Sequence, residues 1–146
     1  NYIQKKLINL HYHIYASTQY LEKNGHPKNT RDLDKHKFIT YGRGAPSPVF
    51  NPDWALKLGT KDSKKRKPVM RVNSVYGLLL AVQSGVGLAA LPDYIALNVP
   101  NIIKVLPDIE GPHTETHFVY PQSLKNVAKV KAFRNFLFSK VSEWKF

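Results

Sequence analysis

The sequence predicts an α/β fold with a parallel β-sheet, and one stretch of the chain carries most of this prediction. Val69–Val72 has the composition of a short strand, and the apolar residues of Val75–Val82 lie at the spacing of one helical face. Val86–Leu91 is a continuous apolar run that stops at Pro92, as expected for a strand buried on both faces. A strand, a helix and a second strand in this order place the two strands parallel in one sheet.

The first part of the chain predicts a strand, a short helix and a second strand. Ile8–Ala16 alternates apolar and polar side chains, which indicates a half-buried strand. Ser17-Thr18 can cap a helix that stops at Asn24-Gly25, where a left-handed glycine can end it. Lys37–Tyr41 then predicts a short strand that breaks at Gly42.

The remaining segments predict short strands and one long helix. The proline-rich Ala45–Asp53 is expected to be an irregular loop, and Trp54–Leu58 a strand. Asp93 is expected to cap a short helix. The later elements are expected in the order Tyr94–Leu97 (helix), Asn101–Leu106 and Thr116–Tyr120 (strands) and Asn126–Trp144 (helix). One face of the long helix is apolar, through Val127, Val130, Phe133, Leu137, Val141 and Trp144.

The chain is strongly basic, with 22 Lys and Arg against 10 Asp and Glu and a net charge of +12. This excess suggests an anionic partner, although basic side chains on solvated loops and helix backs explain it equally well. The densest group is expected in a loop and comprises Lys61, Lys64, Lys65, Arg66, Lys67 and Arg71. The absence of cysteine excludes disulfides and fits a cytoplasmic protein, and no apolar run is long enough to predict a membrane partner.

No group of residues predicts catalysis, a metal site or a cofactor. Gly85-Val-Gly87 lacks the third glycine of a dinucleotide loop, because position 90 is Ala90, and it precedes a strand instead of following one. His11 and His13 could lie on one side of a strand as metal ligands do, but no third ligand can be placed. We therefore expect a binding protein and no enzyme.

A ligand site is expected where strands end. In an open α/β sheet, ligands bind beyond the carboxyl ends of the strands, and the free amides at the start of a helix attract anions. Asn73 or Ser74 can cap the helix that follows, whose first amides are such a site, and Gly85 lies where this helix would end in a left-handed residue. Each candidate residue follows a predicted strand, and we expect all of them to share one cleft: Ser17, Thr18, Tyr41, Gly42, Asn73 and Ser74.

Four segments resemble the C-terminal effector-binding domain of LysR-type transcriptional regulators. They are Tyr12-His-Ile-Tyr-Ala-Ser17, Asp32-Leu33-x-x-His36, Ser84-Gly-Val-Gly-Leu-Ala-Ala-Leu-Pro92, and Phe118-Val-Tyr-Pro121 with Val130-x-Ala-Phe-Arg-Asn-Phe-Leu137. The third is moderately specific to the family, and together they cover nearly the whole chain. The residues of these segments look most similar to those of an LsrB-like alphaproteobacterial subgroup.

The resemblance implies two α/β lobes like those of periplasmic solute-binding proteins (type II), with a small-molecule inducer in the cleft between them. Lobe one would hold residues 1–16 and 106–146 and would be incomplete, lacking about its opening third. Lobe two would hold residues 17–105. The resemblance also implies a homo-oligomer, a dimer or tetramer, and DNA contact only through a helix-turn-helix domain that this stretch does not contain.

Two other function classes stay open on the sequence alone. A solute-binding protein of the same fold would show the same elements, and a helix-turn-helix upstream in the gene would decide between the two readings. A basic nucleic-acid-binding module rests on the charge alone, and steep salt dependence of binding to random duplex would reveal it.

Overall fold

The structure, a computed structural model, describes residues 1–42, 51–61 and 64–144. It divides the chain into two units, which are described separately: Asn1–Leu10 with His113–Phe146, and His11–Pro112. Residues 11–16 and 106–112, which the sequence assigned to lobe one, lie in the second, larger unit. None of the described helices is long and apolar enough to cross a membrane.

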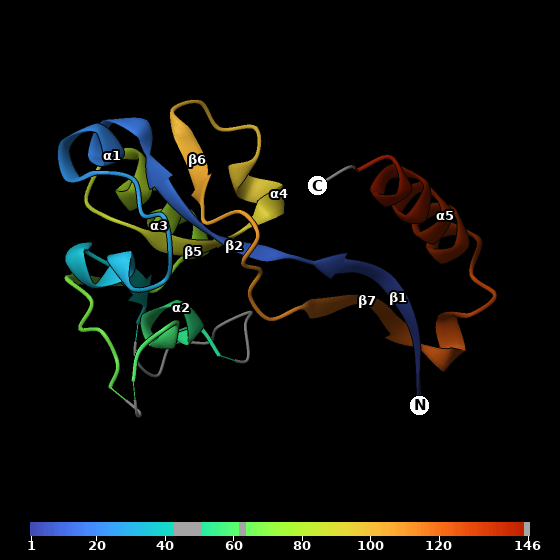
Figure 1. Cartoon of the computed structure of the whole chain (residues 1–146). Helices are drawn as coiled ribbons and strands as arrows, with labels where there is room; N and C mark the ends of the chain where they lie inside the picture. Colours follow the sequence, from blue (N-terminus) through green and yellow to red (C-terminus); the bar gives the residue numbers. More distant parts are fainter. Residues whose placement is uncertain (43–50, 62–63, 145–146) are drawn as a thin grey trace. The chain divides into compact units, whose positions relative to one another are not determined.

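The larger unit holds a three-stranded sheet and a two-stranded sheet, which an isolated bridge joins edge to edge into one mixed sheet (Figure 1). Strand β2 (Tyr12–Ser17) lies between β5 (Ala89–Pro92) and β6 (Ile102–Val105) and runs antiparallel to both. β3 (Ile39–Tyr41) pairs in parallel with β4 (Met70–Val72), and a parallel bridge from Phe38 to Leu88 joins β3 to the segment leading into β5. The predicted parallel arrangement is therefore present in β3, β4 and β5, while β2 and β6 oppose their neighbours.

Helices in this unit begin where the sequence places their caps. Ser17 accepts a hydrogen bond from the backbone N–H of Tyr20 at the start of α1 (Thr18–Asn24). Ser74 does the same for Gly77 at the start of α3 (Val75–Gln83). Gly25 and Gly85 follow these two helices with positive φ, as glycine allows at a helix end.

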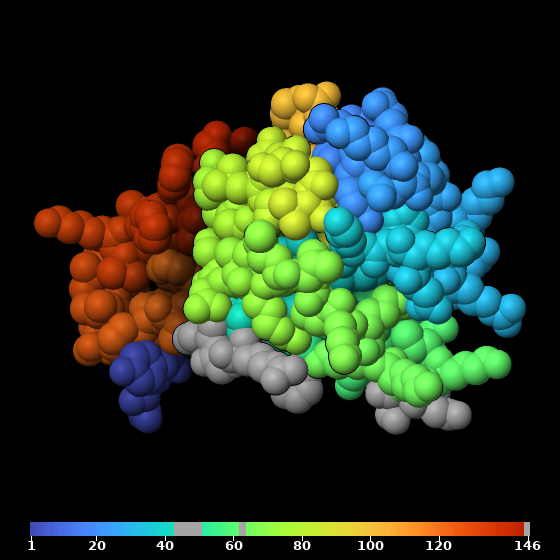
Figure 2. Space-filling view, turned by 90° about the vertical axis from the view of Figure 1, so that its left-hand side faces the viewer, coloured from blue at the N-terminus to red at the C-terminus, as the bar shows by residue number. Residues whose placement is uncertain are grey.

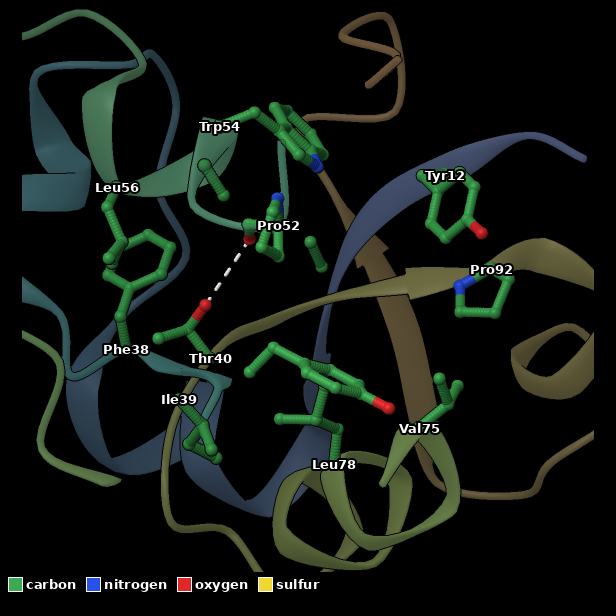
Figure 3. Close-up of a pocket in the computed structure, with 13 residues that line it drawn as sticks. Tyr12, Phe38, Ile39, Thr40, Pro52, Trp54, Leu56, Val75, Leu78 and Pro92 are labelled. Atoms are coloured by element: carbon green, nitrogen blue, oxygen red, sulfur yellow. Dashed lines mark hydrogen bonds between the residues drawn. The ribbon is translucent and has the colours of Figure 1, made fainter. Parts of the chain in front are cut away.

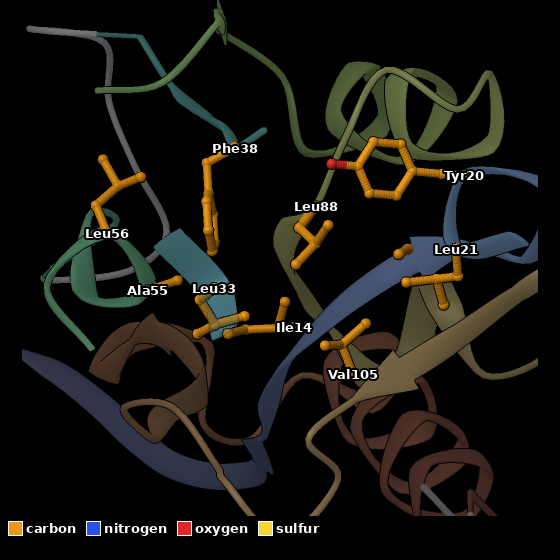
Figure 4. Packing of buried hydrophobic residues seen from close by; sticks show 10 residues of the cluster. Ile14, Tyr20, Leu21, Leu33, Phe38, Ala55, Leu56, Leu88 and Val105 are labelled. Atoms are coloured by element: carbon orange, nitrogen blue, oxygen red, sulfur yellow. The ribbon is translucent and has the colours of Figure 1, made fainter. Parts of the chain in front are cut away.

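Two hydrophobic clusters pack on the two faces of the sheet, so the strands are buried on both sides. Ile14 of β2 belongs to one cluster together with Phe38 and Leu88, which Figure 4 shows. Its neighbour Tyr15 belongs to the other cluster, with Leu78 and Leu79 of α3. The outer face of α3, yellow-green in Figure 2, faces solvent and exposes Tyr76 and Leu80.

Shorter helices complete the larger unit. They are the 3-10 turn η1 (Asp32–Lys35), α2 (Trp54–Lys57) and α4 (Asp93–Ala96). The prediction of a strand at Trp54–Leu58 is wrong, because α2 occupies this position. The loop expected over Ala45–Asp53 lies mostly outside the described residues.

The smaller unit holds a two-stranded antiparallel sheet and the long helix. Strand β1 (Tyr2–Leu10) pairs with β7 (Thr114–Pro121), with a bulge between Lys6 and Ile8. The 3-10 turn η2 (Gln122–Leu124) leads into α5 (Ala128–Ser142). The single strand expected over Ile8–Ala16 is therefore two strands, β1 and β2, separated at His11.

The apolar face of α5 is mostly open in the described structure. Val141 is buried, whereas the side chains of Phe133 and Phe136 are 56% and 59% exposed. The Phe133 ring lies 6.0 Å from that of Phe118 on β7, measured between centroids. Most of this apolar face is therefore uncovered within the described part of the smaller unit.

Candidate functional site

The carboxyl ends of three parallel strands meet at one edge of the larger unit. Tyr41 ends β3 and is paired with Val72, which ends β4. β5 ends at Pro92, which is paired with Tyr12 at the start of the antiparallel β2. This edge is where an open α/β sheet offers a ligand site.

Four of the six predicted site residues come together at this edge. The N–H of Gly42 donates to the carbonyl of Val72 over 3.1 Å, which brings Tyr41 and Gly42 next to Asn73 and Ser74. A Cβ atom at Gly42 would clash with the side-chain amide of Asn73, so a larger residue there would have to displace the Asn73 side chain.

The other two predicted residues, Ser17 and Thr18, lie at the opposite end of the sheet. β2 runs antiparallel to β5, so its carboxyl end points away from Tyr41. Ser17 is buried and caps α1, and the N–H of Thr18 donates to the carbonyl of Asn101 over 2.9 Å. The expectation of one cleft for all six residues is wrong, because it assumed that every strand runs the same way.

A small apolar pocket of about 30 Å³ opens at this same edge (Figure 3). It draws residues from β2, β3, α2, α3 and β5, and Figure 3 shows Tyr12 and Trp54 on one side with Leu78 of α3 opposite. The described lining residues include no charged side chain. They are Tyr12, Phe38, Ile39, Thr40, Tyr41, Pro52, Trp54, Ala55, Leu56, Val75, Leu78, Ala90 and Pro92.

Polar bonds hold one wall of the pocket to the sheet. The hydroxyl of Thr40 on β3 donates to the Asp53 carboxylate over 2.9 Å and lies 3.3 Å from the carbonyl oxygen of Pro52. Asp53 also forms ion pairs with Lys65 and, over 3.6 Å, with Arg71. Burial alone raises the pKa of Asp53, but the bonds from Lys65 and Thr40 outweigh it and lower the pKa.

Trp54 packs on the segment by which the chain leaves the larger unit. A Cβ atom at Gly111 would lie 2.5 Å from two atoms of the Trp54 ring, so the indole occupies the space a side chain would need. The N–H of Gly111 donates to the carbonyl of Tyr12 over 2.8 Å. Trp54 and Tyr12 thus connect the pocket to the paired segments around residues 12 and 111.

A buried polar cluster lies beside this edge and centres on Asp93. Its carboxylate accepts hydrogen bonds from Tyr15 (2.8 Å) and Lys104 (2.9 Å), and His13 Nδ1 lies 2.9 Å from Oδ1. Burial and the bond to Asp93 both raise the pKa of Tyr15, which stays protonated and donates. Asp93 was expected only to cap a helix, but no side-chain cap bond is found at α4.

The two histidines of the predicted pair have different partners. His13 bonds to Asp93, whereas His11 pairs with Glu110. The aromatic residues of the pocket were not among the predicted site residues. Trp54 was missed because it was placed in a strand that is not present. Tyr12 was missed because it was treated only as one position in an alternating strand.

Sequence comparison identifies one family over almost the whole chain. Residues 1–142 match the family described as the LysR substrate binding domain. An uncharacterized HTH-type transcriptional regulator of Haemophilus influenzae is 30% identical over 123 residues, which are 82% of this chain. The chain spans only 41% of that relative's length.

Solved structures share the fold at low sequence identity. The CrgA regulatory domain of Neisseria meningitidis, a LysR-type transcriptional regulator, has a TM-score of 0.79 and 22% identity, with 96% of this chain and 69% of that chain covered. The effector domain of AmpR of Pseudomonas aeruginosa gives 0.67 and 16%, covering 97% and 66%. These matches do not support the assignment to the LsrB-like subgroup that the four sequence segments suggested.

Proposed function

Since the chain belongs to the LysR substrate binding domain family, which is not a family of enzymes, we propose that it senses a small-molecule effector within a LysR-type transcriptional regulator. The family match over residues 1–142 is the observation that carries this proposal. The pocket at the strand ends supports it, because ligands of α/β sheets bind there. The relative's HTH-type name supports DNA contact through a segment outside these residues.

The proposed effector is a small organic anion bound at Tyr41, Gly42, Asn73 and Ser74. The net charge of +12 favours an anion at long range, and the first amides of α3 can donate to it. Ser17 and Thr18 are not part of this proposal, because they lie at the other end of the sheet.

A titration followed by amide NMR tests this site. Benzoate and inorganic phosphate serve as probes, and we expect saturable shifts at the amides of Ser74–Gly77. Ser74→Asp keeps a side chain that can cap α3 but adds like charge, so anion binding is expected to weaken by about tenfold. Ser123→Asp, in the smaller unit, adds the same charge away from the site and is expected to change nothing. Unchanged anion affinity in Ser74→Asp would exclude this assignment.

We also propose that the chain assembles as a homo-oligomer through the open face of α5. Phe133 and Phe136 of α5, and Trp144 shortly after it, are each more than half exposed, and a patch of exposed apolar side chains marks an interaction site. Because Phe136 is exposed, Phe136→Asp should leave the unit folded while placing a charge in any interface.

Sedimentation velocity at micromolar concentrations tests the assembly. The unmodified chain is expected to sediment as a dimer or larger species, and Phe136→Asp as a monomer. Lys131→Gln, at an exposed position of the same helix, makes the same change of one unit in net charge and serves as the control. A folded monomer of the unmodified chain would contradict the proposal.

A further inference from the structure

The lining of the pocket at the ends of β3 and β5 points to the chemistry of its occupant. Four aromatic side chains contribute to it, from Tyr12, Phe38, Tyr41 and Trp54, and the other lining residues are aliphatic apart from Thr40. The Thr40 hydroxyl is already engaged by Asp53. Few polar groups are therefore free to bind a ligand, and a site of this composition binds through contact with apolar surface.

We propose that this pocket holds the uncharged, apolar body of a small aromatic ligand. The inference rests on the proposed function, since it names the chemistry of an effector at the same strand ends. A bare inorganic anion does not fit this pocket, because moving a charge into an uncharged lining is costly. Among the described residues, Lys65 and Arg71 both pair with Asp53 beside the pocket, and Arg71 also donates to the carbonyl of Tyr41 over 2.9 Å.

The pocket's size determines how such a ligand enters. A volume of about 30 Å³ accepts only a few atoms, so an aromatic ring must displace part of the lining. Strand pairing fixes β3 and β5, and Ala55 and Leu56 of α2 are buried in the core, so the backbone of these walls stays in place. Trp54 is only partly buried, and its ring is the part of the α2 wall that a ligand would push aside.

NMR of the full chain with fluorobenzene tests the inference, because this probe has a ring and no charge. Saturable shifts are expected at the Trp54 indole N–H and at the methyl groups of Val75 and Leu78. Val75→Phe fills the pocket from the first turn of α3, and we expect it to weaken binding by about tenfold or more. Leu80→Phe introduces the same ring on the exposed face of α3 and is expected to leave the affinity unchanged.

The outcomes separate this inference from the proposed function. No saturable fluorobenzene shift in the unmodified chain, or equal affinity in Val75→Phe, would overturn the inference. Phosphate shifts at the α3 amides that persist in Val75→Phe would then still support the proposed anion site. Fluorobenzene binding without any phosphate or benzoate shift at those amides would support the apolar pocket and remove the anion site.

Discussion

Tyr15 donates its phenolic hydrogen to the Asp93 carboxylate across 2.8 Å, and both residues are almost completely buried. Lys104 and His13 complete the partners of this carboxylate. The cluster joins β2, β6 and the start of α4 around one negative charge. A buried carboxylate with three donors is stable only while all of them remain in place.

Replacing Asp93 by asparagine is expected to lower the free energy of unfolding by about 3 kcal/mol, because Lys104 then loses its buried counter-charge. Urea unfolding followed by circular dichroism measures this change as a lower midpoint at similar slope. Asp108→Asn, at an exposed position, serves as the control and is expected to have little effect. A midpoint unchanged in Asp93→Asn would mean that the cluster contributes nothing to stability.

Acid is expected to remove the contribution of Asp93. Burial raises its pKa, but the bonds from Lys104, Tyr15 and His13 outweigh burial and lower the pKa in the folded state. The unfolded carboxyl has a pKa of about 3.9, so the stabilisation is complete above that pH and is lost as the pH falls through the lower, folded value. The stability difference between the unmodified chain and Asp93→Asn should therefore shrink below about pH 4. A difference that stays constant in urea titrations down to about pH 2 would contradict this.

Replacing Arg66 even by lysine is expected to lower the stability of the protein. Its guanidinium contacts Asp34 through two nitrogens, at 2.8 and 2.7 Å, and donates to the carbonyl of Leu58 over 2.7 Å. It also lies 5.8 Å from the centre of the Phe38 ring. Lysine cannot reproduce this fork, so Arg66→Lys should cost about 2 kcal/mol. Thermal unfolding measures the loss, with the exposed Lys67→Arg as the control. Equal melting temperatures would show that charge alone suffices.

A methyl group at Gly111 is expected to displace the Trp54 ring, because the added carbon would lie 2.5 Å from it. Fluorescence reports the displacement once Trp144, the other tryptophan, is changed to phenylalanine in both proteins. We expect a shifted emission maximum for Gly111→Ala relative to the Trp144→Phe parent. An identical spectrum would mean that the indole does not respond to this contact. Ser123→Ala, at an exposed position of the smaller unit, controls for the substitution and is expected to leave the spectrum unchanged.

The elements set by local signals were predictable from the sequence. The caps at Ser17 and Ser74 and the positive φ of Gly85 depend on neighbouring residues, and the structure confirms them. Trp54–Leu58 failed because a short apolar run fits a buried helix turn as well as a strand.

The direction of β2 and the contacts of its side chains could not be read from local patterns. In the sequence, His13 and Tyr15 look like the outer face of an alternating strand. In the structure, both form hydrogen bonds with Asp93, which lies about 80 positions further along the chain. Ser17 was assigned to the wrong end of the sheet for a related reason, since strand polarity depends on distant pairing. The pocket combines five separate segments, so its lining appears only in the folded chain.

The contact between Trp54 and Gly111 connects the pocket to the segment by which the chain leaves the larger unit. The chain enters the larger unit after Leu10 and leaves it at Pro112. The backbone hydrogen bond from Gly111 to Tyr12 joins the entering and the leaving segment. In the proposed binding mode, a ring that displaces the indole would change the contact of Trp54 with Gly111, the residue that donates this hydrogen bond. The coupling would then be reciprocal. A substitution that weakens the hydrogen bond between Gly111 and Tyr12 would change the affinity for the ligand by the same factor by which the ligand changes the stability of that bond.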